Sequence, residues 1–227
     1  EDHDHSTKTF LGREGDFNGE DIIQFILEDE ATSQFIARHL YNFFVEDDVQ
    51  VPSWLDIPAK NPEAVNAIAK TFKESDFDIR TTLRFILNSS FFKDESAWFA
   101  KVKNPAEVVA GTIRLVGDFA EPKPGVMDMG LEGAYQGQEL INPPSVEGWH
   151  TGREWIDTGS LVRRVNFVAD MLGNTDFPGV QSIINRIGQK GTLSPENLVD
   201  SCLELLGAIQ IDKGTREELI THAAESG

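Results

Sequence analysis

Two histidines and three carboxylates fill the first five positions of the sequence, Glu1-Asp2-His3-Asp4-His5. Imidazole nitrogens and carboxylate oxygens are ligands for divalent metals, and zinc in particular takes both kinds. His3, Asp4 and His5 are therefore the candidate metal ligands. The alternative is a solvated chain end, because terminal residues are often poorly ordered and two histidines at i and i+2 are not held in a fixed geometry. The position in the chain favours this alternative.

A second acidic run, at 16–21, superficially resembles a calcium-binding loop. Such a loop has glycine at its sixth position and a bidentate glutamate at its twelfth. Counted from Asp16, the glycine is at the fourth position and the twelfth residue is Leu27. We therefore interpret Asn18 as the N-cap of a helix, since asparagine accepts hydrogen bonds from the free amides of a first helical turn.

A third group follows in the segment 149–155, which contains two tryptophans, a histidine and an arginine, with further arginines at 163 and 164. Aromatic faces, a titratable imidazole and cations that lie this close in sequence can line a cleft for a polar or anionic ligand. The alternative is that the tryptophans bury the loop while the arginines pair with carboxylates. The candidate ligand-binding residues are Trp149, His150, Arg153, Trp155 and Arg163.

Other chemistry has no motif in this sequence. It contains no GxSxG, P-loop, GxGxxG, HExxH or CxxC pattern, so the catalytic residues are unknown. Cys202 is the only cysteine, which excludes an internal disulfide and a thiolate metal cluster. Its helical spacing with neighbouring leucine and valine residues predicts a small buried side chain.

Helices must position these groups, and their starts are marked by capping residues and by proline at the first helical position. The second predicted helix carries a wide apolar stripe that includes Phe35 and Phe43, which we expect to be buried. Two helices near 160–172 and 180–187 have no such start signal. The other predicted helices begin near Asn18, Asp29, Asn61, Asp78, Asn104, Ser194 and Thr215.

The resulting fold class is all-α: an orthogonal bundle of about nine helices with one long loop rich in proline, glycine and tryptophan at 137–158. Sustained alternation of apolar and polar residues, which would indicate strands, is missing. We expect 1–227 to form a single helical domain, with a possible subdivision near 137–158, because structureless segments of that length are uncommon inside compact domains.

The formal net charge of −18, from 20 Lys plus Arg and 38 Asp plus Glu, argues against nucleic acid as a partner. Phosphate backbones are bound largely through neutralising cations. An anionic membrane surface is disfavoured for the same reason, and no apolar run approaches the roughly 20 residues that span a bilayer. We therefore expect no membrane insertion.

Several segments in order resemble one family. They are HDHSTKTFLG, GEDII, ATSQFIARHLYNFFV, KVKNPAEVVAGTIRLVG and GQELINPPSVEGWHTGREWI. Together they are similar to the carboxy-terminal part of the bacterial domain of unknown function 1800. The resemblance implies a largely helical protein about twice this length. It also implies export from the cell, to the periplasm or the cell surface, and a protein partner from a neighbouring exported family. It supplies no catalytic residues, because the family has no established activity.

Three hypotheses of function follow. The first is a non-catalytic helical interaction domain of an exported protein. The second is a metal-assisted hydrolase whose cleft includes the 137–155 loop, with a divalent metal held by His3, Asp4 or His5. Clustering of these residues with His150 would favour this hypothesis. The third is a glycan-binding module that stacks sugars on Trp149 and Trp155, which requires exposed rings.

Overall fold

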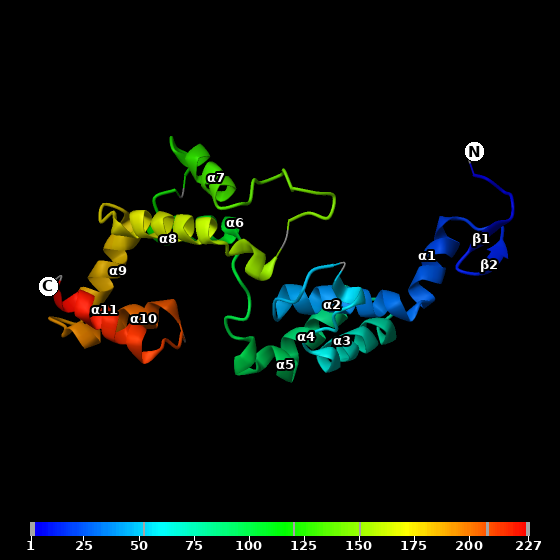
Figure 1. Cartoon of the computed structure of the whole chain (residues 1–227), viewed down its shortest axis with the longest axis horizontal. Helices are drawn as coiled ribbons and strands as arrows, with labels where there is room; N and C mark the ends of the chain where they lie inside the picture. Colours follow the sequence, from blue (N-terminus) through cyan, green and yellow to red (C-terminus); the bar gives the residue numbers. More distant parts are fainter. Residues whose placement is uncertain (1–2, 52, 120, 150, 208, 226–227) are drawn as a thin grey trace. The chain divides into compact units, whose positions relative to one another are not determined.

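The computed structural model describes residues 3–51, 53–119, 121–149, 151–207 and 209–225 (Figure 1). The contacts between residues divide the chain into two compact units. Unit 1 contains residues 1–104 and 144–157, and unit 2 contains 105–143 and 158–227. The boundary at 143/144 falls inside the segment where the sequence predicted a subdivision. The single domain stays a prediction.

The described residues form an all-α fold with a single pair of short strands, which confirms the predicted fold class. Eleven α-helices are present in this part of the chain, against about nine expected. The two helices that the sequence analysis did not predict are α5 (Ser90–Lys93) and α7 (Val126–Tyr135).

Unit 1 begins with the strands β1 (Lys8–Phe10) and β2 (Arg13–Gly15), which pair antiparallel with Lys8 opposite Gly15. The helices that follow are α1 (Gly19–Glu28), α2 (Glu30–Phe44), α3 (Pro62–Glu74) and α4 (Ile79–Asn88), and then α5. Short 3₁₀ turns lie at Ser53–Leu55 (η1), Glu95–Ala97 (η2) and Gly152–Trp155 (η3).

Side-chain caps fix the helix starts of unit 1. The Asn18 carboxamide oxygen accepts from the Glu20 and Asp21 amides at 2.9 and 3.1 Å, and the Asp21 carboxylate accepts from the Asn18 amide at 3.0 Å. This reciprocal pair is a capping box, which confirms the interpretation of Asn18 as a cap. Asn61 and Asp78 cap α3 and α4 through the amides three residues on.

The core of unit 1 lies where α2 packs on α3 and α4. Its fully buried residues are Ala37, Tyr41, Val45, Ala64, Val65, Ile68, Ala69 and Ile86. The expected burial of the whole apolar stripe on α2 was wrong for Phe35 and Phe43, which are 47% and 70% exposed. Both rings line a surface cleft, described below, and neither belongs to the buried cluster of this core.

A buried ion pair borders this core. The Arg38 Nε donates to the Asp48 carboxylate at 2.8 Å, and the two side chains are 8% and 1% exposed. The same guanidinium donates to the Ile57 carbonyl and lies over the Trp54 ring, 4.6 Å from its centroid. Arg38 therefore connects the core to the indole ring of Trp54.

Unit 2 contains α6 (Pro105–Val116), α7, α8 (Thr158–Gly173), α9 (Pro178–Gly188), α10 (Pro195–Leu206) and α11 (Lys213–Glu225). Its core joins α6, α8 and α9 through Val109, Val116, Phe167, Met171 and Val180. On α10 the predicted burial of Cys202 was wrong, because its side chain is exposed and the inward positions are Val199 and Ser201.

Candidate functional site

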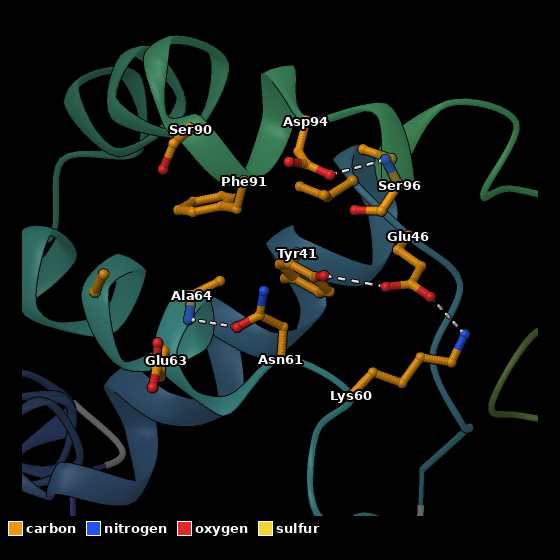
Figure 2. A pocket seen from close by; sticks show the side chains of 13 residues that line it. Tyr41, Glu46, Lys60, Asn61, Glu63, Ala64, Ser90, Phe91, Asp94 and Ser96 are labelled. Atoms are coloured by element: carbon orange, nitrogen blue, oxygen red, sulfur yellow. Dashed lines mark hydrogen bonds and ion pairs between the residues drawn. The ribbon is translucent and has the colours of Figure 1, made fainter.

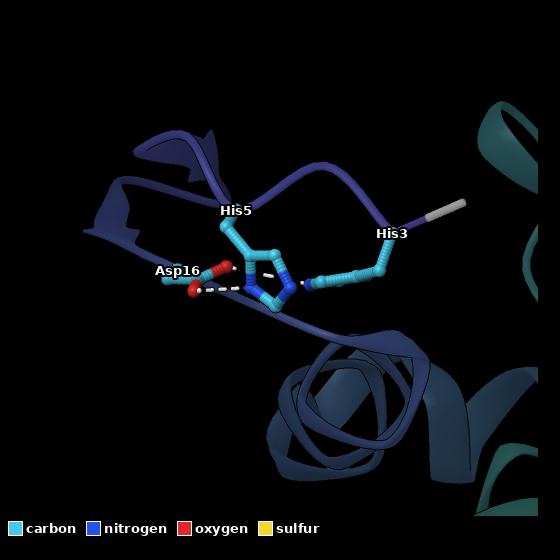
Figure 3. A group of neighbouring side chains, drawn as sticks. All are labelled: His3, His5 and Asp16. Carbon is cyan, nitrogen blue, oxygen red and sulfur yellow. Dashed lines mark hydrogen bonds and ion pairs between the residues drawn. The ribbon is translucent and has the colours of Figure 1, made fainter. Parts of the chain in front are cut away.

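His3, His5 and Asp16 form a compact group of side chains beside the β-hairpin (Figure 3). His3 Nε2 lies 3.4 Å from one carboxylate oxygen of Asp16, and His5 Nδ1 lies 3.1 Å from the other. The two imidazole rings meet edge to face, with centroids 4.6 Å apart. One ligand atom from each residue lies within 4.8 Å of the others. We call this group the histidine cluster.

The sequence named Asp4 as the carboxylate partner of the histidines, but the structure brings Asp16 to them. Asp4 instead accepts from the amide and the hydroxyl of Ser6, both at 2.9 Å. These two hydrogen bonds hold the pKa of Asp4 below its ordinary value, and the bond from the Ser6 amide has the larger effect. The Asp4 carboxylate is thus committed to a local turn.

The hairpin explains why Asp16 reaches residues 3 and 5. Leu11 and Gly12 both have positive φ, 48° and 76°, as in the tight turns that reverse a two-stranded hairpin. The reversal places the residue after β2 beside the segment before β1. Asp16 lies two residues before Asn18, the N-cap of α1. The hairpin is tied to that helix by Arg13, whose guanidinium donates to Glu28 at 2.7 Å.

Lys8 also reaches this group. Its ammonium donates to the Asp16 carboxylate at 3.3 Å, to the Ser6 carbonyl at 3.2 Å and to the Asp4 carbonyl. The pKa of Asp16 is held below its ordinary value, chiefly by the hydrogen bond from His5 and further by Lys8 and His3. Asp16 is therefore ionised at neutral pH and available as an anionic ligand.

A second feature of unit 1 is a cleft of about 440 Å³ between α2 and residues 147–149 and 151, which we call the aromatic cleft. His39 is central to it, because its ring centroid lies 4.5 Å from that of Phe35 and 4.5 Å from that of Trp54. Trp149 enters from the loop. The lining residues are Phe35, His39, Asn42, Phe43, Gln50, Val51, Trp54, Lys101, Glu147, Gly148, Trp149 and Thr151.

Two further contacts fix the position of the Trp54 ring in this cleft. Trp54 Nε1 donates to the Val49 carbonyl at 2.6 Å, and the Arg38 guanidinium lies over the indole face. Partial burial holds the pKa of His39 below its ordinary value of 6.5, so its imidazole is neutral at neutral pH. A neutral imidazole offers one donor and one acceptor.

Polar groups complete the aromatic cleft. Gln50 donates through its amide nitrogen to the Thr151 hydroxyl, which connects the two sides of the cleft. The Lys101 ammonium donates to the Asp47 carboxylate at 2.7 Å and to the Asn42 carbonyl. Asp47 thus compensates the charge of Lys101. The amide of Gln50 and the hydroxyl of Thr151 are uncharged.

The structure separates the site residues that the sequence grouped together. Trp149 lines the aromatic cleft, whereas Arg153 is exposed and Trp155 is only 8% exposed. Arg163 belongs to unit 2, where its guanidinium makes a paired contact with Glu132, with Nε 2.8 Å from one oxygen and Nη2 2.5 Å from the other. The burial of Trp155 removes its ring as a stacking platform. His150 lies outside the described residues, so its assignment as a ligand-binding residue stays a prediction, and its clustering with the N-terminal histidines is not tested.

Sequence reasoning missed Phe35, His39 and Trp54. A usable signal was present, since Phe35 and His39 are four residues apart on one helix and therefore share a face. The apolar residues of that face were interpreted as core, so their role in lining a cleft was missed.

A further pocket of about 580 Å³ surrounds Tyr41, next to α3 and α5 (Figure 2). The Tyr41 hydroxyl donates to Glu46 at 3.2 Å, and Lys60 holds the other oxygen of that carboxylate at 2.9 Å. Asn61 and Asp94 accept from the helix amides of Ala64 and Ser96. These hydrogen bonds and the ion pair stabilise the fold around the pocket.

Among the described residues, no helix combines the length and the apolar character needed to cross a bilayer.

The fold and the two features of unit 1 define a helical protein with an N-terminal hairpin, a histidine cluster and an aromatic cleft. The chain belongs to the family described as protein of unknown function (DUF1800), whose model matches residues 1–227. This membership confirms the resemblance read from the sequence. Comparison with curated proteins and with solved structures gave no match.

Proposed function

We propose that this chain is a non-catalytic binding domain and that the aromatic cleft binds a neutral saccharide. The observation that carries the proposal is the composition of the cleft. The aromatic rings of α2, Trp54 and Trp149 enclose about 440 Å³ together with amide and hydroxyl groups. Ligand sites in proteins typically have this size and this mixture of many apolar and few polar groups.

The charges of the cleft favour a neutral ligand. Lys101 is paired with Asp47, and the other charged side chain on the lining is that of Glu147. The whole chain carries a net charge of −18, which repels polyanions. A phosphorylated or sulfated ligand is therefore disfavoured.

A sugar matches the remaining groups. A pyranose ring has an apolar C–H face that packs on an aromatic ring, and hydroxyls that exchange hydrogen bonds with amide and imidazole groups. The rings of Trp54 and Trp149 can take the first role. Asn42, Gln50 and His39 can take the second, although Asn42 Oδ1 already accepts from the Asp48 amide at 2.9 Å. This assignment replaces the buried Trp155 of the original hypothesis with Trp54.

The test is calorimetric titration of the chain with cello-, xylo- and chito-oligosaccharides. We expect binding by at least one series, weakened about tenfold or more by Trp149→Ala or Trp54→Ala, since a tenfold change in affinity is about 1.4 kcal/mol. Trp98→Ala is the matched control, because Trp98 is 50% exposed in the same unit and does not line the cleft. Absence of binding by every series would contradict the proposal. So would an equal loss in the Trp98 variant.

We further propose that the domain works outside the cytoplasm, in a larger envelope or surface protein with a protein partner. The support is the resemblance on which this expectation was first based, together with the family membership. Cell fractionation of the native source followed by immunodetection tests it. Recovery of the protein in the cytoplasmic fraction alone would reject this part of the proposal.

A further inference from the structure

We propose that His3, His5 and Asp16 bind a divalent transition-metal ion, of which zinc is the best match. The inference is independent of the aromatic cleft. It rests on three ligand-bearing side chains that two separate chain segments bring together beside the hairpin (Figure 3).

The donor atoms select the metal. Two imidazole nitrogens and one carboxylate oxygen suit zinc and its neighbours in the first transition row, whereas calcium and magnesium prefer oxygen ligands alone. Zinc sites with three protein ligands of this kind keep a fourth position for water or another molecule. The exposure of His5, whose side chain is 77% exposed, leaves room for that fourth ligand.

The distances are close to those that a shared ion imposes. With bonds of about 2.0–2.2 Å in tetrahedral geometry, two ligand atoms on one zinc ion are roughly 3.3–3.5 Å apart. His3 Nε2 and an Asp16 oxygen are 3.4 Å apart, and His5 Nδ1 and the other oxygen are 3.1 Å apart. The three ligand atoms, one from each residue, lie within 4.8 Å of one another, so binding to a single ion would draw them closer together.

The carboxylate ligand is held by the fold. Asp16 lies between β2 and the capping box of α1, and Arg13 ties the same strand to Glu28. The histidines precede β1, so a bound ion would crosslink the N-terminal segment to the hairpin. The ammonium of Lys8 shares the carboxylate but also contacts two carbonyls, which can retain it when the metal takes the oxygen.

The experiment is titration of zinc chloride alone into the untagged, chelator-treated chain at neutral pH, followed by calorimetry. Cobalt absorption spectra report the geometry of the site. We expect one ion per chain and an affinity that falls at least tenfold in His3→Ala, His5→Ala and Asp16→Asn. Asp4→Asn is the matched control, because Asp4 is the neighbouring carboxylate that the structure commits to Ser6.

The inference would be overturned by no binding to the unmodified chain, or by binding that Asp16→Asn leaves unchanged. A loss in Asp4→Asn as large as that in Asp16→Asn would equally reject this ligand set. Circular dichroism of the metal-free variants shows whether they remain folded. Since the three ligands are exposed, we expect melting curves like that of the unmodified chain. The oligosaccharide titration has a different readout, so failure of either proposal leaves the other intact.

Discussion

Gly152 lies directly against Asp47: a Cβ atom added to Gly152 would be 3.2 Å from the Asp47 Cβ and 3.3 Å from its carboxyl carbon. Asp47 in turn accepts from the Val102 amide at 2.6 Å and pairs with Lys101. This contact seats the segment 144–157 on the rest of unit 1, and that segment supplies one side of the aromatic cleft.

Gly152→Ala should therefore loosen the cleft as well as strain the backbone, because φ at this position is +66°. We expect a loss of about 1–3 kcal/mol in the free energy of unfolding, measured by urea denaturation, together with weaker ligand binding. Gly148→Ala is the control for stability, since Gly148 has φ +90° but no atom within 4 Å of an added Cβ. An equal loss in both variants would show that the Asp47 contact has no effect of its own.

The buried pair of Arg38 and Asp48 should dominate the stability of unit 1. Arg38→Ala leaves the Asp48 carboxylate, 1% exposed, without its cation, and we expect a loss of about 3–5 kcal/mol. Urea denaturation followed by tryptophan fluorescence measures it. The exposed pair of Lys70 and Glu74, 3.8 Å apart, is the comparison, and Lys70→Ala should cost less than about 0.5 kcal/mol. Comparable losses from the two substitutions would contradict the assigned role of the buried pair.

Stability at high pH should depend on Tyr41. Burial, followed by the charge of Glu46, raises the pKa of Tyr41 to about 12. The unfolded chain loses this proton near pH 10 while the folded chain keeps it, so the contribution is fully present below pH 10 and is lost between about 10 and 12. Denaturation curves across that range test this, and Tyr41→Phe should remove the pH-dependent component. The idea fails if the substitution leaves the pH dependence as it was.

His39 should produce the opposite trend at acid pH. Partial burial lowers the pKa of His39 below 6.5, so the unfolded chain takes up a proton before the folded chain does. The contribution is therefore fully present above pH 6.5 and is lost as the pH falls through the lowered value. Nuclear magnetic resonance of the imidazole C–H signals measures the pKa directly. A pKa at or above 6.5 would reject the assigned burial.

Local signals in the sequence predicted most of the helices because capping is local. Asn18, Asn61 and Ser194 each accept from an amide two or three residues further along, which the sequence makes visible. Helix α7 gave no such signal, because its N-cap is Gly125, at φ +94°, without a side-chain hydrogen bond. The hairpin was hidden in the same way, since its turn has leucine at a position where asparagine or aspartate usually marks positive φ.

The candidate sites were harder to predict because contacts distant in sequence assemble them. The two histidines were identified from their type, but their carboxylate partner is Asp16, which only strand pairing brings near. Trp149 was identified within an aromatic loop. Its partners on α2 were taken for core, since an apolar stripe does not say whether every one of its residues meets another helix.

The division of unit 1 into two stretches of sequence has a consequence for synthesis on the ribosome. Residues 105–143, including the whole of α6 and α7, emerge between the helices of unit 1 and the segment 144–157 that completes it. Because translation proceeds from the amino terminus at about 5–20 residues per second, α2 and η1 wait for several seconds with one wall of the cleft uncovered. Until residue 157 has emerged, Phe35, Phe43 and Trp54 of the nascent chain are accessible to chaperones that bind at the ribosomal exit tunnel.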